Sequence, residues 1–292
     1  MPSLDDLKKR IKSVKSTQKI TKAMKMVAAA KLRKAQENAE KGRPYSQKMQ
    51  NIILNLTKSI NDPLNAPKLL VGTGKDKTYL CLVLTADRGL CGGFNSNICK
   101  LAKSNFKKII SEGKELKIIT VGSKGLDQIK REYGKYIIKK FSFKDKKQIT
   151  FKEAEIIGKE IINLFKQNEF DKCILFFNNF KNVITQIPQA QQIIPVENNL
   201  SMDEKGTSFT YEFEPDEDEI LEDLLPKNIS TQVFKAFLEN AASEQGSRMT
   251  AMDNATRNAG DLVDKLTINY NRSRQASITK ELIEIISGAE SL

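Results

Sequence analysis

The clearest candidate for chemistry is a glycine-rich turn at residues 87–95, with the sequence DRGLCGGFN. It follows a β-type run at residues 79–85 and precedes a helical pattern at residues 96–112. Phosphate-binding loops form in such places because the amides of a helix N-terminus face the ligand. However, the turn has neither the dinucleotide-binding nor the P-loop spacing, and no Lys-Ser/Thr pair. We interpret it as a tight packing turn, with a nucleotide-binding α/β enzyme as an alternative; the turn at residues 122–125 is a weaker candidate.

Other catalytic residues are scarce. The chain has 292 residues and no histidine, which excludes an imidazole base, Ser-His and Cys-His pairs and histidine metal ligands. The four cysteines show no CxxC spacing, so we expect reduced, buried thiols. The lack of histidine thus removes many catalytic schemes, and we expect no catalytic residue, no metal site and no cofactor site. The cysteines are Cys81, Cys91, Cys99 and Cys173.

The chain is basic, with a formal net charge of +12. Residues 1–60 hold fifteen Lys/Arg against four Asp/Glu, so nearly all of the excess lies there. This charge suits an acidic partner, and a nucleic-acid-binding coiled coil is one alternative. Against it, the first 44 residues lack an aromatic side chain for base stacking. The longest apolar run, residues 80–84, is far shorter than the ~20 residues that span a bilayer, and no signal-peptide pattern is seen; we expect a soluble chain.

Long amphipathic helices are predicted at both ends. In the first, residues 1–60, Leu4, Leu7, Ile11 and Val14 are spaced by three and four, a seam of the coiled-coil type. The seam turns polar around Thr17, Gln18 and Thr21. We interpret the next small and apolar residues as part of the packed seam: Met24, Met26 and Ala28–Ala30. Gly42, Arg43 and Pro44 should kink or interrupt this helix. In the last helix Pro226 is expected near the start, Gly246 as an interruption and Gly288 as a C-cap.

The middle of the chain alternates β-type and helical runs, which predicts a Rossmann-like α/β domain with a largely parallel sheet at residues 70–209. Because it lies between the terminal helices, these should pair as a long antiparallel coiled coil. Residues 210–292 comprise an acidic segment and the last helix, paired with residues 1–60. The acidic stretch, residues 203–223, holds ten acids and one lysine and could be a linker.

Four stretches resemble the gamma subunit of F-type ATP synthases of the bacterial type, in the same order along essentially the whole chain. They are residues 11–32 (IKSVKSTQKITKAMKMVAAAKL), 87–95, 239–249 (ENAASEQGSRM) and 270–281 (YNRSRQASITKE). The resemblance implies a central rotor shaft. By rotating, the shaft would couple proton or sodium flow through a membrane ring to ATP synthesis or hydrolysis at an alpha–beta head. Catalytic residues would belong to the beta subunits, so the chain would not be an enzyme by itself.

The resemblance also implies contact residues and partners. Met24 and Lys25 match the helix segment that faces an acidic lever of the beta subunit, although some members carry Glu at the position of Lys25. Arg248, Gln275 and Thr279 match polar contacts with beta-subunit loops. Tyr211, Phe213 and Glu214 match the region that contacts the membrane ring, where the family often has a second tyrosine in place of Phe213.

The implied partners are three alpha and three beta subunits, the epsilon subunit and the ring of c subunits, with no nucleic acid and no directly bound nucleotide. The implied location is peripheral, at the cytoplasmic face of the bacterial inner membrane.

Overall fold

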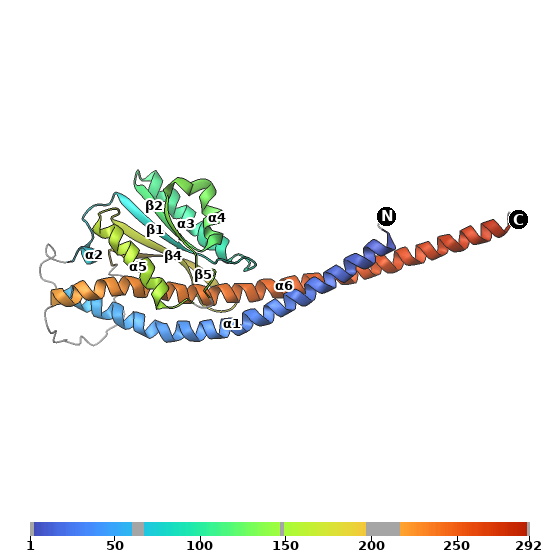
Figure 1. The fold of residues 1–292 in the computed structure, drawn as a ribbon, viewed down its shortest axis with the longest axis horizontal. Helices are drawn as coiled ribbons and strands as arrows, with labels where there is room; N and C mark the ends of the chain where they lie inside the picture. The colour runs from blue at the N-terminus through green and yellow to red at the C-terminus, as the bar shows by residue number, and fades with distance from the viewer. Residues whose placement is uncertain (1–2, 60–66, 147–148, 197–216, 291–292) are drawn as a thin grey trace. The chain divides into compact units, whose positions relative to one another are not determined.

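The computed structural model describes residues 3–59, 67–146, 149–196 and 217–290. It divides into two compact units. The smaller comprises Met1–Ala30 and Arg248–Leu292, and the larger Lys31–Ser247. Two long helices, α1 (Leu4–Ser59) and α6 (Glu217–Glu290), each contribute to both units (Figure 1).

The larger unit is built on a five-stranded sheet of order β3-β2-β1-β4-β5. The first four strands are parallel, and β5 is antiparallel to β4. Strand β1 is buried along almost its whole length, as expected of a parallel strand that is covered on both faces. The strands are β1 (Thr78–Leu84), β2 (Glu115–Val121), β3 (Ile137–Phe141), β4 (Lys172–Phe180) and β5 (Gln186–Ile194).

Helices cover both faces of this sheet (Figure 1). On one face lie α3 (Phe94–Ser111) and α4 (Ser123–Tyr133); on the other lie α5 (Phe151–Lys166) and the first half of α6. Alternate residues of β1 enter the two cores, because side chains along a strand point to opposite faces. Leu80, Leu82 and Leu84 pack with α5 and α6, whereas Cys81 and Val83 pack with α3 and α4. The predicted fold class is confirmed.

The expected interruption of the first helix is wrong: α1 continues through Gly42 and Pro44 to Ser59. A proline inside a helix costs about 3 kcal/mol, and the burial of two side chains further along offsets this cost. Met49 and Ile53 pack against Leu221 and Leu225 of α6 and against Leu70 of α2 (Lys68–Val71). Gly42 serves close packing, since a Cβ there would lie 2.8 Å from Cδ1 of Leu238.

Three predictions about the last helix are also wrong. Pro226 lies inside α6, which begins nine residues earlier at Glu217, because Leu221 and Leu225 bury that extra stretch. Gly246 does not interrupt α6 but is buried within it. Gly288 is not a cap, because α6 continues to Glu290. A glycine inside a helix costs only about 1 kcal/mol relative to alanine, so it does not end a helix by itself.

The smaller unit is a two-helix antiparallel pair, as predicted. Leu7 and Ala28 of α1 and Met252, Ala259 and Val263 of α6 are its buried apolar residues. A polar layer interrupts this seam, where the hydroxyl of Thr256 donates to Oγ1 of Thr21 at 2.8 Å. Met26 is exposed, as are Ala29 and Ala30, so their interpretation as seam residues is wrong: the three- and four-residue spacing from Thr21 reaches Ala28 but turns these three outward.

Candidate functional site

Lys25, expected to face an acidic partner, already has a carboxylate neighbour within the helix pair. Its Nζ lies 2.6 Å from Oδ1 of Asp253, and Nη2 of Arg257 lies 2.6 Å from Oδ2 of the same carboxylate. Lys25, and then Arg257, hold the pKa of Asp253 below its ordinary value. The three side chains together leave one net positive charge at the surface. Met24, beside Lys25, is half-buried.

The predicted polar contacts lie at two separate places on α6. Gln275 and Thr279 are both exposed and share one face of the helix, and the Thr279 hydroxyl donates to the Gln275 carbonyl at 2.9 Å. Arg248 is half-buried. It precedes Gln275 by 27 residues, or roughly 40 Å of α-helix at 1.5 Å per residue. The structure therefore does not bring these three residues into one site.

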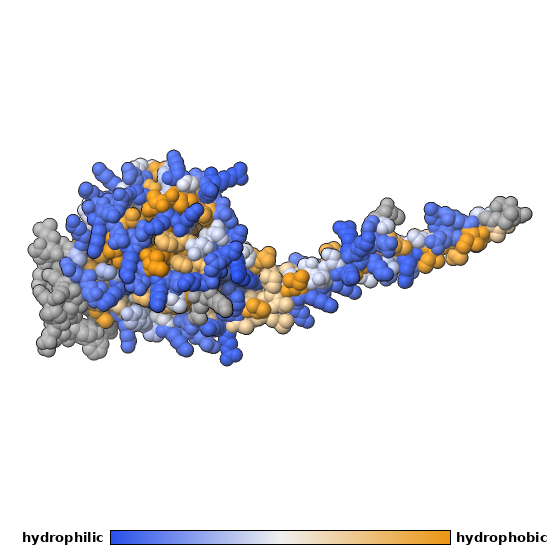
Figure 2. All heavy atoms as spheres, in the orientation of Figure 1, coloured by the Kyte–Doolittle hydropathy of each residue, from blue (hydrophilic) through white to orange (hydrophobic). Residues whose placement is uncertain are grey.

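The last turns of α6 carry an apolar surface that α1 does not cover. Seam residues of α6 remain half-buried as far as Ser277, and beyond this point α6 extends past the N-terminal end of α1 (Figure 1). Figure 2 shows apolar side chains along this end. Among the described residues nothing packs over them, which makes this surface the strongest candidate for contact with another protein. They are Ile278 (50% exposed), Leu282 (53%), Ile283 (58%), Ile285 (68%) and Ile286 (57%).

The expected ring-docking residues, Tyr211, Phe213 and Glu214, lie outside the described residues. The chain on either side of that segment is firmly packed in the larger unit. Val196 and Leu221 both belong to the small apolar core around Ile53 and Leu70, and Pro195 lies against Gly72, where a Cβ would be 3.5 Å from the proline ring.

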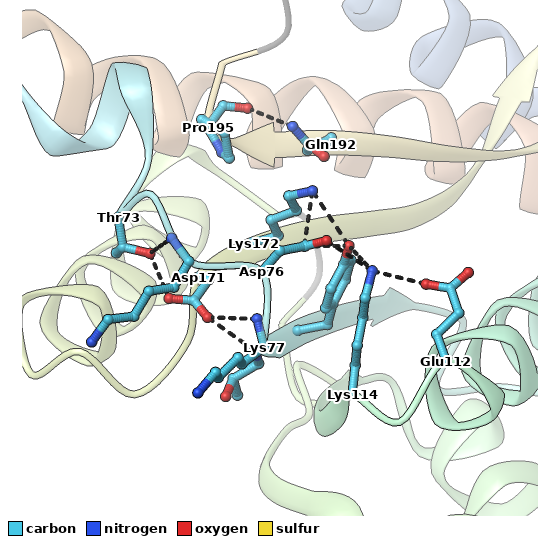
Figure 3. A network of polar contacts seen from close by, with 12 residues as sticks. Thr73, Asp76, Lys77, Glu112, Lys114, Asp171, Lys172, Gln192 and Pro195 are labelled. Carbon is cyan, nitrogen blue, oxygen red and sulfur yellow. Dashed lines mark hydrogen bonds and ion pairs between the residues drawn. The ribbon is translucent and has the colours of Figure 1, made fainter.

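A charged network fixes the strand ends beside Pro195 (Figure 3). Asp76 pairs with Lys114 at 2.8 Å and with Lys172 at 2.9 Å, and it accepts a hydrogen bond from the hydroxyl of Tyr79 at 2.7 Å. Lys114, Tyr79 and then Lys172 hold the pKa of the Asp76 carboxyl far below its usual range. These contacts tie the start of β4 to the segments that precede β1 and β2.

Hydrogen bonds tie the glycine-rich turn to several neighbouring elements. Asp87 accepts hydrogen bonds from the amide of Ser123 (2.9 Å), the hydroxyl of Ser142 (2.8 Å) and the amide of Phe143 (3.1 Å). Ser123 is the first residue of α4, so the Asp87 carboxylate occupies the N-terminus of the helix that follows the weaker candidate turn at residues 122–125. At the other end of the turn, the hydroxyl of Ser247 donates to the Cys91 carbonyl at 2.7 Å.

An ion pair joins the two long helices in the larger unit. Nε and Nη2 of Arg43 donate to the two carboxylate oxygens of Glu239 at 2.8 and 3.1 Å, and Nη2 also donates to the Phe180 carbonyl at 3.2 Å. The side chain of Glu239 is only 3% exposed. Bidentate pairs of this kind are among the stronger polar contacts in proteins.

Within the described part of the chain, no helix is both long enough and apolar enough to cross a membrane. The described residues also hold no group of three or more His, Cys, Asp or Glu side chains arranged to bind a metal ion.

Comparison with known proteins identifies the family. The family model described as ATP synthase matches residues 3–292. The ATP synthase gamma chain of Pelagibacter ubique (strain HTCC1062) is 72% identical over 292 residues, which is the whole of both chains. This chain belongs to the ATP synthase gamma family. The gamma chain of Rhizobium leguminosarum bv. trifolii (strain WSM2304) is 58% identical over 294 residues, again covering 100% of both chains.

Solved structures related to this gamma-family chain share its fold. A chain in the central stalk and c-ring structure of the Tetrahymena thermophila mitochondrial ATP synthase is 27% identical with a TM-score of 0.59. That match covers 81% of this chain and 99% of the other. A chain in the Euglena gracilis mitochondrial ATP synthase, OSCP/F1/c-ring, in rotational state 3, is 19% identical with a TM-score of 0.69 and covers 99% and 94%. The second likeness shows the fold alone.

Several residues of this gamma-family chain were missed by sequence reasoning. Asp253 and Thr256, which meet Lys25 and Thr21, were not singled out because their partners are more than 200 positions away. Continuing the heptad pattern through the polar stretch of α1 would have shown that Thr21 faces the partner helix and needs a polar residue opposite it. Ile283 and Ile286 lay beside the predicted stripe of Ile278, Leu282 and Ile285, and the whole surface proved exposed.

Proposed function

We propose that this gamma-family chain is the central rotor shaft of an F-type ATP synthase. In this role it couples ion flow through a membrane ring to ATP synthesis or hydrolysis at an alpha–beta head. The observation that carries the proposal is the continuity of α6, from residues packed on the sheet to an apolar end that nothing in the described chain covers. One helix thus contributes residues both to the α/β domain and to a surface suited to a partner.

The proposed mechanism needs no catalytic group on this chain. A two-helix shaft has different side chains on its different faces, so three alpha–beta pairs around it would each meet a different surface. The nucleotide affinity of each catalytic site would then depend on the angle of the shaft, which is a coupling free energy between remote sites. The chemistry would belong to the beta subunits.

The charges of the helix pair suit the predicted partner surfaces. Lys25 and Arg257 share the single carboxylate of Asp253, which leaves positive charge to face an acidic lever of a beta subunit beside Met24. Gln275 and Thr279 present polar groups immediately before the apolar end of α6. Together with Arg248, they are proposed to contact beta-subunit loops as the shaft turns.

The other proposed partners lie at the opposite end of the coupling path. Tyr211, Phe213 and Glu214 would dock on the polar loops of the c-subunit ring, and the α/β domain would also contact the epsilon subunit. The packing of Val196 and Leu221 in the apolar core around Ile53 and Leu70 supports this, because described residues on both sides of the docking segment belong to the larger unit. The chain would then be peripheral, at the cytoplasmic face of the bacterial inner membrane.

A membrane-retention experiment tests this function. Membranes that carry the ring should hold the ATPase head and take up protons on ATP addition only when this chain is present. Glu214→Lys should loosen retention modestly and most visibly at low ionic strength, since a rim ion pair contributes ~0.2–1 kcal/mol and is screened by salt. Replacing Tyr211 and Phe213 together with Ala should release more activity into solution, because aromatic anchors contribute more than rim charges.

Exposed Lys140→Gln on β3 is the matched control. Retention and proton uptake that do not require the chain would contradict the rotor role. Retention by both docking variants equal to that of the parent would instead make residues 211–214 a linker.

A further inference from the structure

The sheet of the larger unit opens between β1 and β4 at its carboxyl edge. These two strands pair from Tyr79↔Lys172 to Val83↔Phe176. Beyond that point β1 ends at Leu84, whereas β4 continues to Phe180 paired only with β5. The order β3-β2-β1-β4-β5 reverses direction here, and open α/β sheets bind their ligands in the crevice at such a reversal.

In this chain α6 fills that crevice with its own side chains. Nδ2 of Asn240 donates to the Leu84 carbonyl of β1 at 3.1 Å, and Oδ1 of Asn240 accepts from the Asn178 amide of β4 at 2.7 Å. One buried amide therefore bridges the two strands where their own ladder has stopped. It satisfies a donor and an acceptor that would otherwise be buried without partners, which is costly.

Neighbouring residues of α6 extend the same attachment. Glu239 accepts a hydrogen bond from the Phe180 amide at 3.0 Å, Ser243 donates to the Asn178 carbonyl at 3.3 Å, and Ser247 donates to the Cys91 carbonyl at 2.7 Å. Asn240, Ser243 and Ser247 are spaced by three and four, so they share one face of the helix. Glu239, Asn240 and Ser243 are buried.

We propose that Asn240, Ser243 and Ser247 form a joint that transmits torque between α6 and the α/β domain. The proposal rests on the proposed rotor function. It adds the contact through which α6 is attached to the α/β domain. Apolar contacts are non-directional, although close packing also resists rotation of a helix against a sheet. Hydrogen bonds to the main chain of β1, β4 and the glycine-rich turn are directional, so they add a resistance to rotation of α6 that depends on its angle. The crevice between β1 and β4, which holds a ligand in other α/β proteins, is thus the attachment site of α6 in this chain.

The test compares coupling with hydrolysis in the complete, membrane-reconstituted complex. Asn240→Ala removes both bridging bonds, and the milder Ser243→Ala/Ser247→Ala double variant removes two others while leaving Asn240 in place. Asn163→Ala is the matched control, because Asn163 is exposed on α5 of the same domain. The readouts are protons taken up per ATP hydrolysed, ATP hydrolysis by the detached head, and amide exchange at Asn178.

We expect both joint variants to lower proton uptake per ATP severalfold, while the detached head hydrolyses ATP like the parent. Exchange at the Asn178 amide should rise roughly tenfold in Asn240→Ala, the effect of losing one net hydrogen bond. Asn240→Gln keeps the side-chain amide, so a return of proton uptake per ATP to the parent value in this variant would support a positioning role for the amide of residue 240.

Two outcomes overturn the proposal and can be told apart. In the first, the Asn178 amide exchanges faster in Asn240→Ala, but the variant takes up as many protons per ATP as the parent. The hydrogen bonds then exist without transmitting torque, and the proposed joint is rejected while the rotor function stands. If the parent complex itself takes up no protons in a way that depends on this chain, the proposed function fails and the joint with it. Should Asn240→Ala fail to assemble, the Ser243→Ala/Ser247→Ala double variant decides by the same ratio.

Discussion

Replacing Arg43 with methionine should lower the free energy of unfolding of the larger unit by about 3 kcal/mol. Methionine keeps much of the apolar volume, but it leaves the Glu239 carboxylate, whose side chain is 3% exposed, without its bidentate partner. Removing one member of a buried ion pair costs about 3–5 kcal/mol. We expect the lower end because the Arg43 side chain is itself 39% exposed. Amide exchange at the buried residues of β1 measures this loss, because amides of core strands are expected to exchange mainly through global opening.

Two further variants separate the ion pair from a general effect of removing arginine. Arg33→Met is the matched control on the same helix, because Arg33 is 86% exposed and its i,i+4 partner Glu37 is 54% exposed; such pairs contribute about 0.3–0.5 kcal/mol. Adding Glu239→Gln to Arg43→Met should restore part of the stability, since glutamine can still accept from the Phe180 amide. Equal losses in Arg33→Met and Arg43→Met would contradict the assignment.

Polar substitution of the apolar end of α6 should weaken assembly with the alpha–beta head by about tenfold. The variant is Ile278→Asn, Leu282→Asn and Ile286→Asn, a stripe spaced by four. Full burial of each side chain would contribute about 1.5–3 kcal/mol. A surface that must slide within a ring cannot fit each side chain into a pocket, so only a fraction is expected, and about 1.4 kcal/mol corresponds to tenfold. Titration of the head with labelled chain measures the change.

The matched control for this variant lies on the same turns of α6. Lys280→Ala with Glu284→Ala removes an exposed i,i+4 ion pair whose atoms are 3.5 Å apart and leaves the apolar stripe intact. Amide protection of the sheet should be unchanged in both variants, because the stripe belongs to the smaller unit. If the control weakens assembly as much as the apolar variant, the contact is not hydrophobic.

The parts of the fold that follow from local periodicity could be predicted from the sequence. The spacing of Leu4, Leu7, Ile11 and Val14 predicts the first helix, and the apolar run at residues 79–85 predicts β1. Helix ends were predicted less well, because the prediction at Pro44 and Pro226 considered only the local cost of a proline within a helix and not the burial of neighbouring side chains. The burial of Ile53 and Leu225 in a core shared by distant segments decides both positions, and a single sequence does not reveal which segments meet.

The polar contacts show the same limit more sharply. Arg43 was read as part of a helix breaker, yet its partner Glu239 lies 196 positions away. Asn240 lies in residues 239–249, which were used only for the family resemblance. The sequence does indicate that Asn240 has a hydrogen-bond partner, because it follows Val233 and Phe237 on one helix face and a buried asparagine needs such a partner. What the sequence could not show is that this partner is the open edge between β1 and β4.

The central claim, that this chain rotates within the head, is tested most directly by watching it turn. A probe can be placed selectively on a new thiol in the variant Lys130→Cys, because Lys130 of α4 is exposed and the four native cysteines are buried. With the alpha–beta head fixed to a surface, ATP should drive the probe around repeatedly in one direction, and Asn163→Ala should behave like the parent. A probe that only fluctuates about one angle while the same heads hydrolyse ATP would contradict the account.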